Sequence, residues 1–235
     1  MVGTWCILPS AASANVVAKA GLDFIIIDME HGAMNFETAL GMVMAAQTEG
    51  CSAIIRVMRN DESLVLRALE TGADGVMVPH IEKVSEAVAF ASYAKYPPEG
   101  KRGFSPYARA CGYCSSEGVT KKQNKKVLTA ILLEDAEAIK MAGDFALQKG
   151  VDAVYIGTYD LSSSLGVPGK TNDSKVLVIL KEAVAKIRKA GKVAGCMAHN
   201  PEEIKILKAM GVNLILYSVD TFALFSHFEK ITTKA

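Results

Sequence analysis

Short apolar runs alternate with longer amphipathic segments along the whole chain. Eight apolar runs of strand length occupy residues 3–8, 24–28, 53–57, 75–79, 128–134, 153–157, 193–198 and 214–219. Apolar residues recur with a helical period at residues 35–49, 62–70, 83–95, 136–149, 174–189 and 201–210. Strand-sized runs that alternate with helical patterns are typical of a parallel sheet whose strands are connected by helices.

The junction from helix to strand repeats along the chain as AGLD (residues 20–23), TGAD (71–74), KGVD (149–152) and MGVN (210–213). A repeated junction and eight strands predict an α/β fold of the (β/α)8 TIM-barrel type, in which residues 1–235 form one domain. An open, doubly wound sheet is the alternative, but it gives no reason for eight evenly spaced strands. The long stretch 97–126 is expected to be irregular, and loops of that length are often functional.

Composition narrows the class of protein. Lys and Arg number 26 and Asp and Glu 25, so the net charge of +1 argues against a nucleic-acid-binding protein. Half of the residues are hydrophobic and the mean hydropathy is +0.22, yet no uncharged apolar run is long enough to span a membrane. We therefore expect a large buried core and no membrane partner. Because no secretory signal is visible, we also expect a cytoplasmic protein.

The cysteines fit that expectation. Their number is five, which is odd, so we expect reduced thiols. Cys111 and Cys114 form a lone C-x2-C pair in a loop-like stretch. A zinc site would need a second pair of ligands, and none follows in the sequence.

In a barrel, the residues at the carboxyl ends of the strands build the active site. Glu134 and Asp160 stand at the ends of two neighbouring strands and are candidate ligands of a hard divalent cation such as Mg²⁺ or Mn²⁺. Asp135 and Asp160 also precede possible helix starts, where carboxylates cap backbone N–H groups. Spacing alone leaves both interpretations open.

Other strand ends carry basic groups. His31 follows Asp28 and Glu30, and a carboxylate bonded to its ring would make it a general base, although an exposed loop histidine is the alternative. Arg56 ends an apolar strand and requires an anionic partner, either a protein carboxylate or a substrate carboxylate or enolate.

The remaining candidates are less specific. We expect His80 and His199 to be rim residues and His227 to be structural. Arg109 in the long loop is either a cover for a bound anion or solvated. The turn at residues 157–162 (GTYDLS) leads into a helix and offers backbone N–H groups to a carboxylate. No lysine interrupts a strand near its end, which disfavours a Schiff-base aldolase.

The chain resembles the HpcH/HpaI aldolase family of the phosphoenolpyruvate/pyruvate-binding barrel superfamily. The resemblance extends almost from end to end. It rests on residues 3–5 (GTW), 20–23, 27–31 (IDMEH), Arg56 with 60–61 (ND), 78–79 (VP), 96–103 (YPPEGKRG), Glu134, 156–162 (IGTYDLS) and 218–220 (SVD). It implies a class II, divalent-metal-dependent aldolase that cleaves or forms 4-hydroxy-2-oxo acids, with pyruvate and an aldehyde as the two halves.

The resemblance also implies roles for individual residues. Glu134 and Asp160 match the ligands of Mg²⁺, Mn²⁺ or Co²⁺, and Arg56 matches the arginine that stabilises the pyruvate enolate. His31, supported by Asp28, matches the histidine of proton transfer. Substrate-binding positions fall on Gly157, Thr158, Tyr159, Arg109, Trp5 and Ser218. Glu70 falls where a neighbouring subunit contributes an acid.

Family members form hexamers, as trimers of dimers that exchange their last helix, which would begin here near Asp220. The sequence departs from the family at Leu132, where glutamine is common, and at the Thr158-Tyr159 pair of the turn. It also begins without the usual helix before the first strand, which would open the bottom of the barrel.

Two other functions remain open at this point. A relative of the superfamily could use the same enolate site for lysis, hydrolysis or decarboxylation of another 2-oxo acid or an acyl-CoA. A basic rim at Lys121, Lys122, Lys125 and Lys126 would suit the phosphates of coenzyme A, although a solvated loop is the alternative. A barrel without activity is the third hypothesis, which the joint presence of His31, Arg56, Glu134 and Asp160 opposes.

Overall fold

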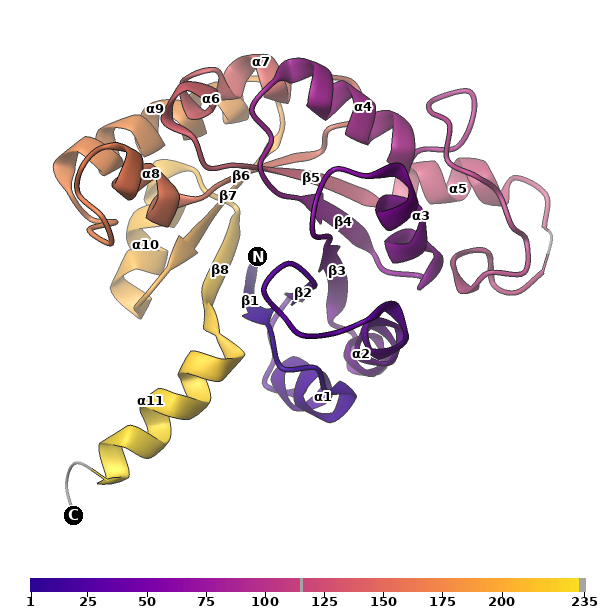
Figure 1. Ribbon diagram of the computed structural model, residues 1–235, viewed down its shortest axis with the longest axis horizontal. Coiled ribbons are helices and arrows are strands. Elements are labelled where there is room, and N and C mark those ends of the chain that lie inside the picture. Colours follow the sequence, from indigo (N-terminus) through magenta and orange to yellow (C-terminus); the bar gives the residue numbers. More distant parts are fainter. Residues whose placement is uncertain (115, 233–235) are drawn as a thin grey trace.

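The structure, a computed structural model, describes residues 1–114 and 116–232. Its strands are parallel and form a closed barrel in chain order, in which β8 pairs with β1 (Figure 1). They are β1 (Val2–Cys6), β2 (Phe24–Asp28), β3 (Ser52–Arg56), β4 (Gly75–Val78), β5 (Leu128–Leu133), β6 (Ala153–Ile156), β7 (Val193–Ala198) and β8 (Leu214–Val219). The predicted (β/α)8 barrel and each of its strands are therefore confirmed.

The helices surround the barrel (Figure 1). They are α1 (Ala11–Lys19), α2 (Phe36–Thr48), α3 (Glu62–Glu70), α4 (Val84–Ala94), α5 (Val119–Lys126), α6 (Ala136–Lys140), α7 (Ala142–Ala146), α8 (Thr158–Ser164), α9 (Ser174–Lys189), α10 (Pro201–Met210) and α11 (Asp220–Thr232), with a 3-10 turn η1 at Arg109–Cys111. The single helix expected over 136–149 is wrong, because α6 and α7 meet at a break at Met141.

The expectation of an irregular stretch over 97–126 is also wrong, because η1 and α5 lie within it. The sequence of α5, VTKKQNKK, carries no apolar stripe. Its buried Asn124 instead accepts a hydrogen bond from the backbone N–H of Tyr96 at 2.7 Å and donates one to the Tyr96 carbonyl at 3.0 Å. A helix held by polar contacts gives no signal in a hydrophobic pattern.

Alternate strand residues fill two separate cores. On β2, Phe24 and Ile26 belong to the cluster inside the barrel, whereas Ile25 and Ile27 belong to the larger cluster beneath the helices. Side chains of a strand point alternately to its two faces, so both faces of this sheet are apolar. The interior of a (β/α)8 barrel is filled by such side chains, so it is a packed core and not a pore.

The repeated helix-to-strand junction has one structural role. In each copy, the Asp or Asn side chain accepts the backbone N–H of a residue in or next to the preceding strand. The pairs are Asp23 with Val2, Asp74 with Ala53, Asp152 with Thr129 and Asn213 with Ala194, at 2.6–3.1 Å. These bonds set the relative height of neighbouring strands at the amino-terminal end of the barrel.

The last helix, α11, extends away from the barrel (Figure 1). Asp220, its first residue, is buried and accepts the backbone N–H groups of Ile7 and Leu8 at 3.0 and 3.1 Å. The rest of α11 exposes a row of large apolar side chains: Phe222, Leu224, Phe225, Phe228 and Ile231. Among the described residues, no helix is long and apolar enough to cross a membrane.

Candidate active site

A cavity of about 540 Å³ opens at the carboxyl ends of the strands. It is lined by Trp5, Ile7, Asp28, His31, Arg56, Leu132, Glu134, Tyr155, Gly157, Thr158, Tyr159, Asp160, Met197, His199, Ser218, Val219 and Phe222. All the site residues expected from the sequence, except Arg109 and Glu70, are among them. The cavity is the candidate active site.

Arg56 is a buried cation on the floor of this cavity. Its Nε and Nη2 atoms donate to Oδ1 and Oδ2 of Asp28 at 2.9 and 2.5 Å. Its Nη1 lies 2.9 Å from Oε2 of Glu30, an ion pair without hydrogen-bond geometry, and its guanidinium carbon lies 4.3 Å above the Trp5 ring. The guanidinium is therefore held in one orientation, and its other N–H groups remain free among the described residues.

The expected contact between Asp28 and the ring of His31 is wrong. Asp28 directs its carboxylate to Arg56, the register partner on β3, and bonds His31 only through the backbone N–H at 3.3 Å. The exposed imidazole of His31 lines the cavity and has no hydrogen-bond partner in the described part of the chain. Asp28 thus positions Arg56 rather than the tautomer of His31.

His80 connects two acids of the site. Its Nε2 lies 2.8 Å from Oε1 of Glu30, and its Nδ1 lies 2.8 Å from Oε2 of Glu134. The same Oε2 accepts the backbone N–H of His80 at 3.2 Å. A polar chain therefore runs from Arg56 through Glu30 and His80 to Glu134, and His80 is more than a rim residue.

Glu134 and Asp160 are not helix caps. Asp135 caps α6 by accepting the N–H groups of Glu137 and Ala138, whereas the N-cap of α8 is Gly157. Within the described residues the carboxylate of Asp160 has no hydrogen bond or ion pair. The cap interpretation that the sequence left open for Asp135 and Asp160 is therefore confirmed for Asp135 and wrong for Asp160.

Burial raises the pKa of Glu134, and the charges of Asp160 and Glu30 raise it further, while His80 opposes the shift. Gly157 makes room for this acid: a Cβ atom there would lie 2.8 Å from Cγ of Glu134. The two carboxylates thus share a concave, partly desolvated site in which a cation would relieve their repulsion.

The turn at the start of α8 forms one wall of the cavity. The N–H groups of Thr158 and Tyr159 belong to the first turn, where a helix has no internal acceptors. Tyr159 is half exposed and lies edge-on against His199, with ring centroids 5.4 Å apart. Nδ1 of His199 lies 2.8 Å from Oε2 of Glu203, and this contact fixes the position of the His199 ring.

Sequence reasoning missed three contributors to the site: Tyr155 lines the cavity, whereas Glu30 and His80 contact residues that line it. Glu30 and His80 act through contacts between strands that are distant in sequence. Tyr155 lies inside the barrel edge-on to Trp5, where Gly195 on β7 leaves the space its ring occupies. A tyrosine in an otherwise apolar strand and a histidine after Val-Pro were the available signals.

Comparisons with known proteins agree with the geometry. The sequence profile described as HpcH/HpaI aldolase/citrate lyase matches residues 1–222. The chain belongs to this family.

Individual relatives resemble the chain over most of their length. The 2-dehydro-3,6-dideoxy-6-sulfogluconate aldolase of Pseudomonas putida is 34% identical over 86% of this chain and 79% of its own. The pyruvate aldolase of Rhizobium etli is 30% identical over 97% and 92%. The structure of an HpcH/HpaI aldolase from Desulfitobacterium hafniense has a TM-score of 0.93 and 28% identity over 99% of this chain and 91% of its own. These matches support a lyase of the aldolase kind.

The donors in this cavity fit the divalent cation that the resemblance implies. Oε1 of Glu134 and the carboxylate of Asp160 are free of hydrogen bonds within the described residues, and Oε2 of Glu30 is buried without one. Across residues 1–114 and 116–232, no group of three or more His, Cys, Asp or Glu side chains forms a closed metal site. The free oxygen of Glu134 and the carboxylate of Asp160 suit a hard cation whose other ligands are water and substrate.

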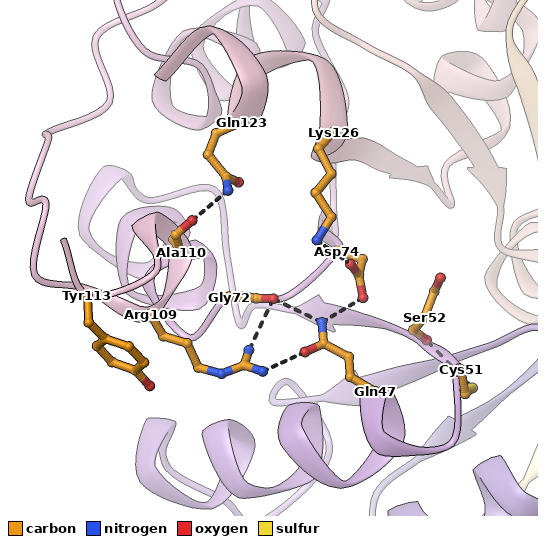
Figure 2. Close-up of a pocket in the computed structure, with 11 residues that line it drawn as sticks. Gln47, Cys51, Ser52, Gly72, Asp74, Arg109, Ala110, Tyr113, Gln123 and Lys126 are labelled. Carbon is orange, nitrogen blue, oxygen red and sulfur yellow. Dashed lines mark hydrogen bonds and ion pairs between the residues drawn. The ribbon is translucent and has the colours of Figure 1, made fainter. Parts of the chain in front are cut away.

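Arg109 lies outside the cavity. Its Nη1 donates to the Thr71 carbonyl at 2.9 Å and its Nη2 to Oε1 of Gln47 at 2.8 Å. Figure 2 shows it in a second pocket, which Asp74 and Lys126 also line, where the chain enters β4 and leaves α5. Because this is the amino-terminal end of the barrel, Arg109 does not face the substrate site of its own chain.

Glu70 also lies outside the cavity. It ends α3 and pairs with Nη2 of Arg102 at 2.8 Å, while Arg102 lies over the Tyr96 ring. Its contribution to the site of a neighbouring subunit stays a prediction.

Proposed function

We propose that this chain is a class II aldolase that cleaves or forms a 4-hydroxy-2-oxo acid, with pyruvate as one product and an aldehyde as the other. One observation carries the proposal: a fixed, buried arginine, the free Oε1 of Glu134 and the carboxylate of Asp160 open into the same cavity. Cleavage of the C3–C4 bond leaves negative charge on the oxygen of the 2-oxo group, and this arrangement places positive charge where that oxygen would bind.

Glu134 and Asp160 would hold Mg²⁺, Mn²⁺ or Co²⁺, since carboxylate oxygens suit all three ions. When bound, the cation supplies Lewis-acid stabilisation of the enolate oxygen. Arg56 shares this work: Asp28, Glu30 and Trp5 fix its guanidinium, and its free N–H groups hold the 2-oxo oxygen.

The remaining wall residues bind substrate and move a proton. The N–H groups of Thr158 and Tyr159 hold the carboxylate of the 2-oxo acid, which the buried start of α8 favours electrostatically. The exposed imidazole of His31 accepts the proton of the C4 hydroxyl during cleavage and returns it during synthesis. Trp5 and Ser218 complete the pocket around pyruvate.

The alternative, chemistry on an acyl-CoA or another 2-oxo acid at the same enolate site, has less support. Lys121, Lys122, Lys125 and Lys126 are exposed on α5 rather than in a loop, and Lys126 pairs with Asp74 at the amino-terminal end of the barrel. This rim therefore lies away from the cavity of its own chain. A barrel without activity is the remaining alternative.

We also propose a homohexamer built from dimers that exchange α11, with Glu70 completing a neighbouring site. The support is the apolar face of α11, which its own barrel leaves uncovered (Figure 1). A hexamer would bury this face between chains.

The deciding experiment is the exchange of the pyruvate methyl protons into D₂O, which needs no knowledge of the aldehyde. Chelator-stripped protein is assayed by NMR with and without Mn²⁺ or Mg²⁺, beside Glu134→Ala and Arg56→Ala. Metal-dependent exchange that both variants lose is the expected result. Bound metal without exchange would move the assignment to another reaction, and absence of both would favour an inactive barrel.

A further inference from the structure

His80 stands between two acids that come from different strands. Its ring reaches Oε1 of Glu30 through Nε2 and Oε2 of Glu134 through Nδ1, each at 2.8 Å. Its backbone N–H donates to the same oxygen of Glu134 at 3.2 Å. Three contacts of one residue thus join the end of β2 to the end of β5.

The backbone of His80 is strained. Its φ angle is +55°, a left-handed conformation that residues other than glycine adopt at a cost. Burial does not hold the ring there, because 64% of the side chain is exposed. The contacts of the ring with Glu30 and Glu134 offset the cost of this backbone conformation. Backbone strain of this kind is typical of functional sites.

These contacts leave Glu134 one free oxygen. Oε2 is occupied by the ring and the N–H of His80, whereas Oε1 has no hydrogen bond among the described residues. On the opposite side of the carboxylate, a Cβ atom at Gly157 would lie 2.8 Å from Cγ and 3.5 Å from Oε1. The Glu134 carboxylate is therefore confined between His80 and Gly157. Gly157 lies three residues before Asp160 in the same turn.

We propose that His80 is a positioning residue for the metal site: it occupies Oε2 of Glu134 so that Oε1 alone is presented to the cation, and it ties this ligand through Glu30 to Arg56. The inference rests on the proposed function, because it concerns the same cation. Hydrogen-bond partners of metal ligands fix ligand orientation, and their loss typically weakens metal affinity about 10–100-fold.

The test is Mn²⁺ binding to chelator-stripped protein by calorimetry, for the wild type and His80→Ala, His80→Gly and His80→Gln. We expect Mn²⁺ affinity to fall at least about tenfold in the Ala and Gly variants alike, because both lack the ring. Gln donates to one carboxylate only, so it restores part of the affinity. The Ala and Gly variants form a matched pair, because both lack the ring and only Gly relieves the backbone strain. We expect the Gly variant to have the higher melting temperature and equally weak Mn²⁺ binding. This result would show that the ring, and not the backbone conformation, supports Mn²⁺ binding.

A second measurement separates positioning from direct contact with substrate. With pyruvate exchange followed as a function of Mn²⁺ concentration, the His80 variants need more Mn²⁺ but approach the wild-type rate at saturation, and the KM for pyruvate stays within about twofold. A rate that stays low at saturating Mn²⁺ would overturn the positioning role.

Two failures are distinguishable. Mn²⁺ that binds the wild type, is lost in Glu134→Ala and binds His80→Ala as tightly or more tightly overturns this inference alone. Mn²⁺ that does not bind the wild type, or binds regardless of Glu134, overturns the proposed metal site and this inference with it.

Discussion

Asp28 and Arg56 are register partners at the ends of β2 and β3, and two hydrogen bonds of 2.9 and 2.5 Å join their side chains. Both are almost completely buried, with side-chain exposures of 3% and 7%. A buried ion pair of this kind gives Arg56 a fixed direction, and it makes the loss of either partner costly.

The first prediction concerns this pair. Arg56→Met leaves the Asp28 carboxylate buried and uncompensated, so we expect a loss of about 3–5 kcal/mol in the free energy of unfolding, measured in urea. Arg56→Met combined with Asp28→Asn recovers part of it, because the lone charge is gone. Lys19→Met, which breaks the exposed pair with Glu49, is the control and leaves the transition unchanged. If Arg56→Met and Lys19→Met lowered the free energy of unfolding equally, the burial argument would be contradicted.

The second prediction concerns Gly157. Its φ of −80° suits any residue, so Gly157→Ala acts only by steric conflict, with the new Cβ 2.8 Å from Cγ of Glu134. We expect about tenfold weaker Mn²⁺ binding by calorimetry, because the ligand is displaced. Gly41→Ala is the matched control: its Cβ meets only Ala11, at 3.7 Å, and a helix interior gains about 0.5–1 kcal/mol from the change. Unchanged Mn²⁺ affinity in Gly157→Ala would show that Glu134 adjusts freely.

The third prediction concerns α11. Phe225→Glu combined with Phe228→Glu places charges on the exposed apolar face, which cannot be buried against another chain without a large desolvation cost. Sedimentation velocity should show the wild type as an oligomer and the double variant as a smaller species. Val178→Glu, at an equally exposed apolar position on α9, leaves the assembly intact. A monomeric wild type would refute helix exchange.

The fourth prediction concerns thiol reactivity. Burial raises the pKa of Cys51 to about 11 and of Cys196 to about 12, and it also raises the pKa of Cys6. The thiolate is the reactive form, and a raised pKa keeps these groups protonated until the pH nears those values. Cys111 is buried, so only the exposed Cys114 should react with a disulfide reagent at pH 8.

We expect Cys114→Ser to lose the fast phase of the reaction with the reagent. The other thiols should react only after the protein is unfolded in denaturant. A second fast thiol in the native protein would show that the core opens more readily than its burial indicates.

The sequence alone determined the barrel and where its site lies. Eight apolar runs and one repeated junction specify equivalent strand–helix units, because each strand must bury both faces and each helix one. Since parallel strands end at the same rim, Glu134, Asp160 and Arg56 could be placed together without a structure. The resemblance to the family also implies a last helix that begins near Asp220, where α11 begins.

Only the tertiary structure decided which of these groups touch. The sequence places Asp28 beside His31, but the Asp28 carboxylate contacts Arg56 on the adjacent strand and reaches His31 only through the backbone N–H. Arg109, expected to face the substrate, is held by Gln47 at the opposite end of the barrel (Figure 2). The link of Glu30 to Glu134 through His80 depends on how far β2, β4 and β5 extend along the barrel axis relative to one another. Periodicity specifies which face of a strand is buried, whereas the partner of a polar side chain is set by distances across the barrel that the linear pattern does not contain.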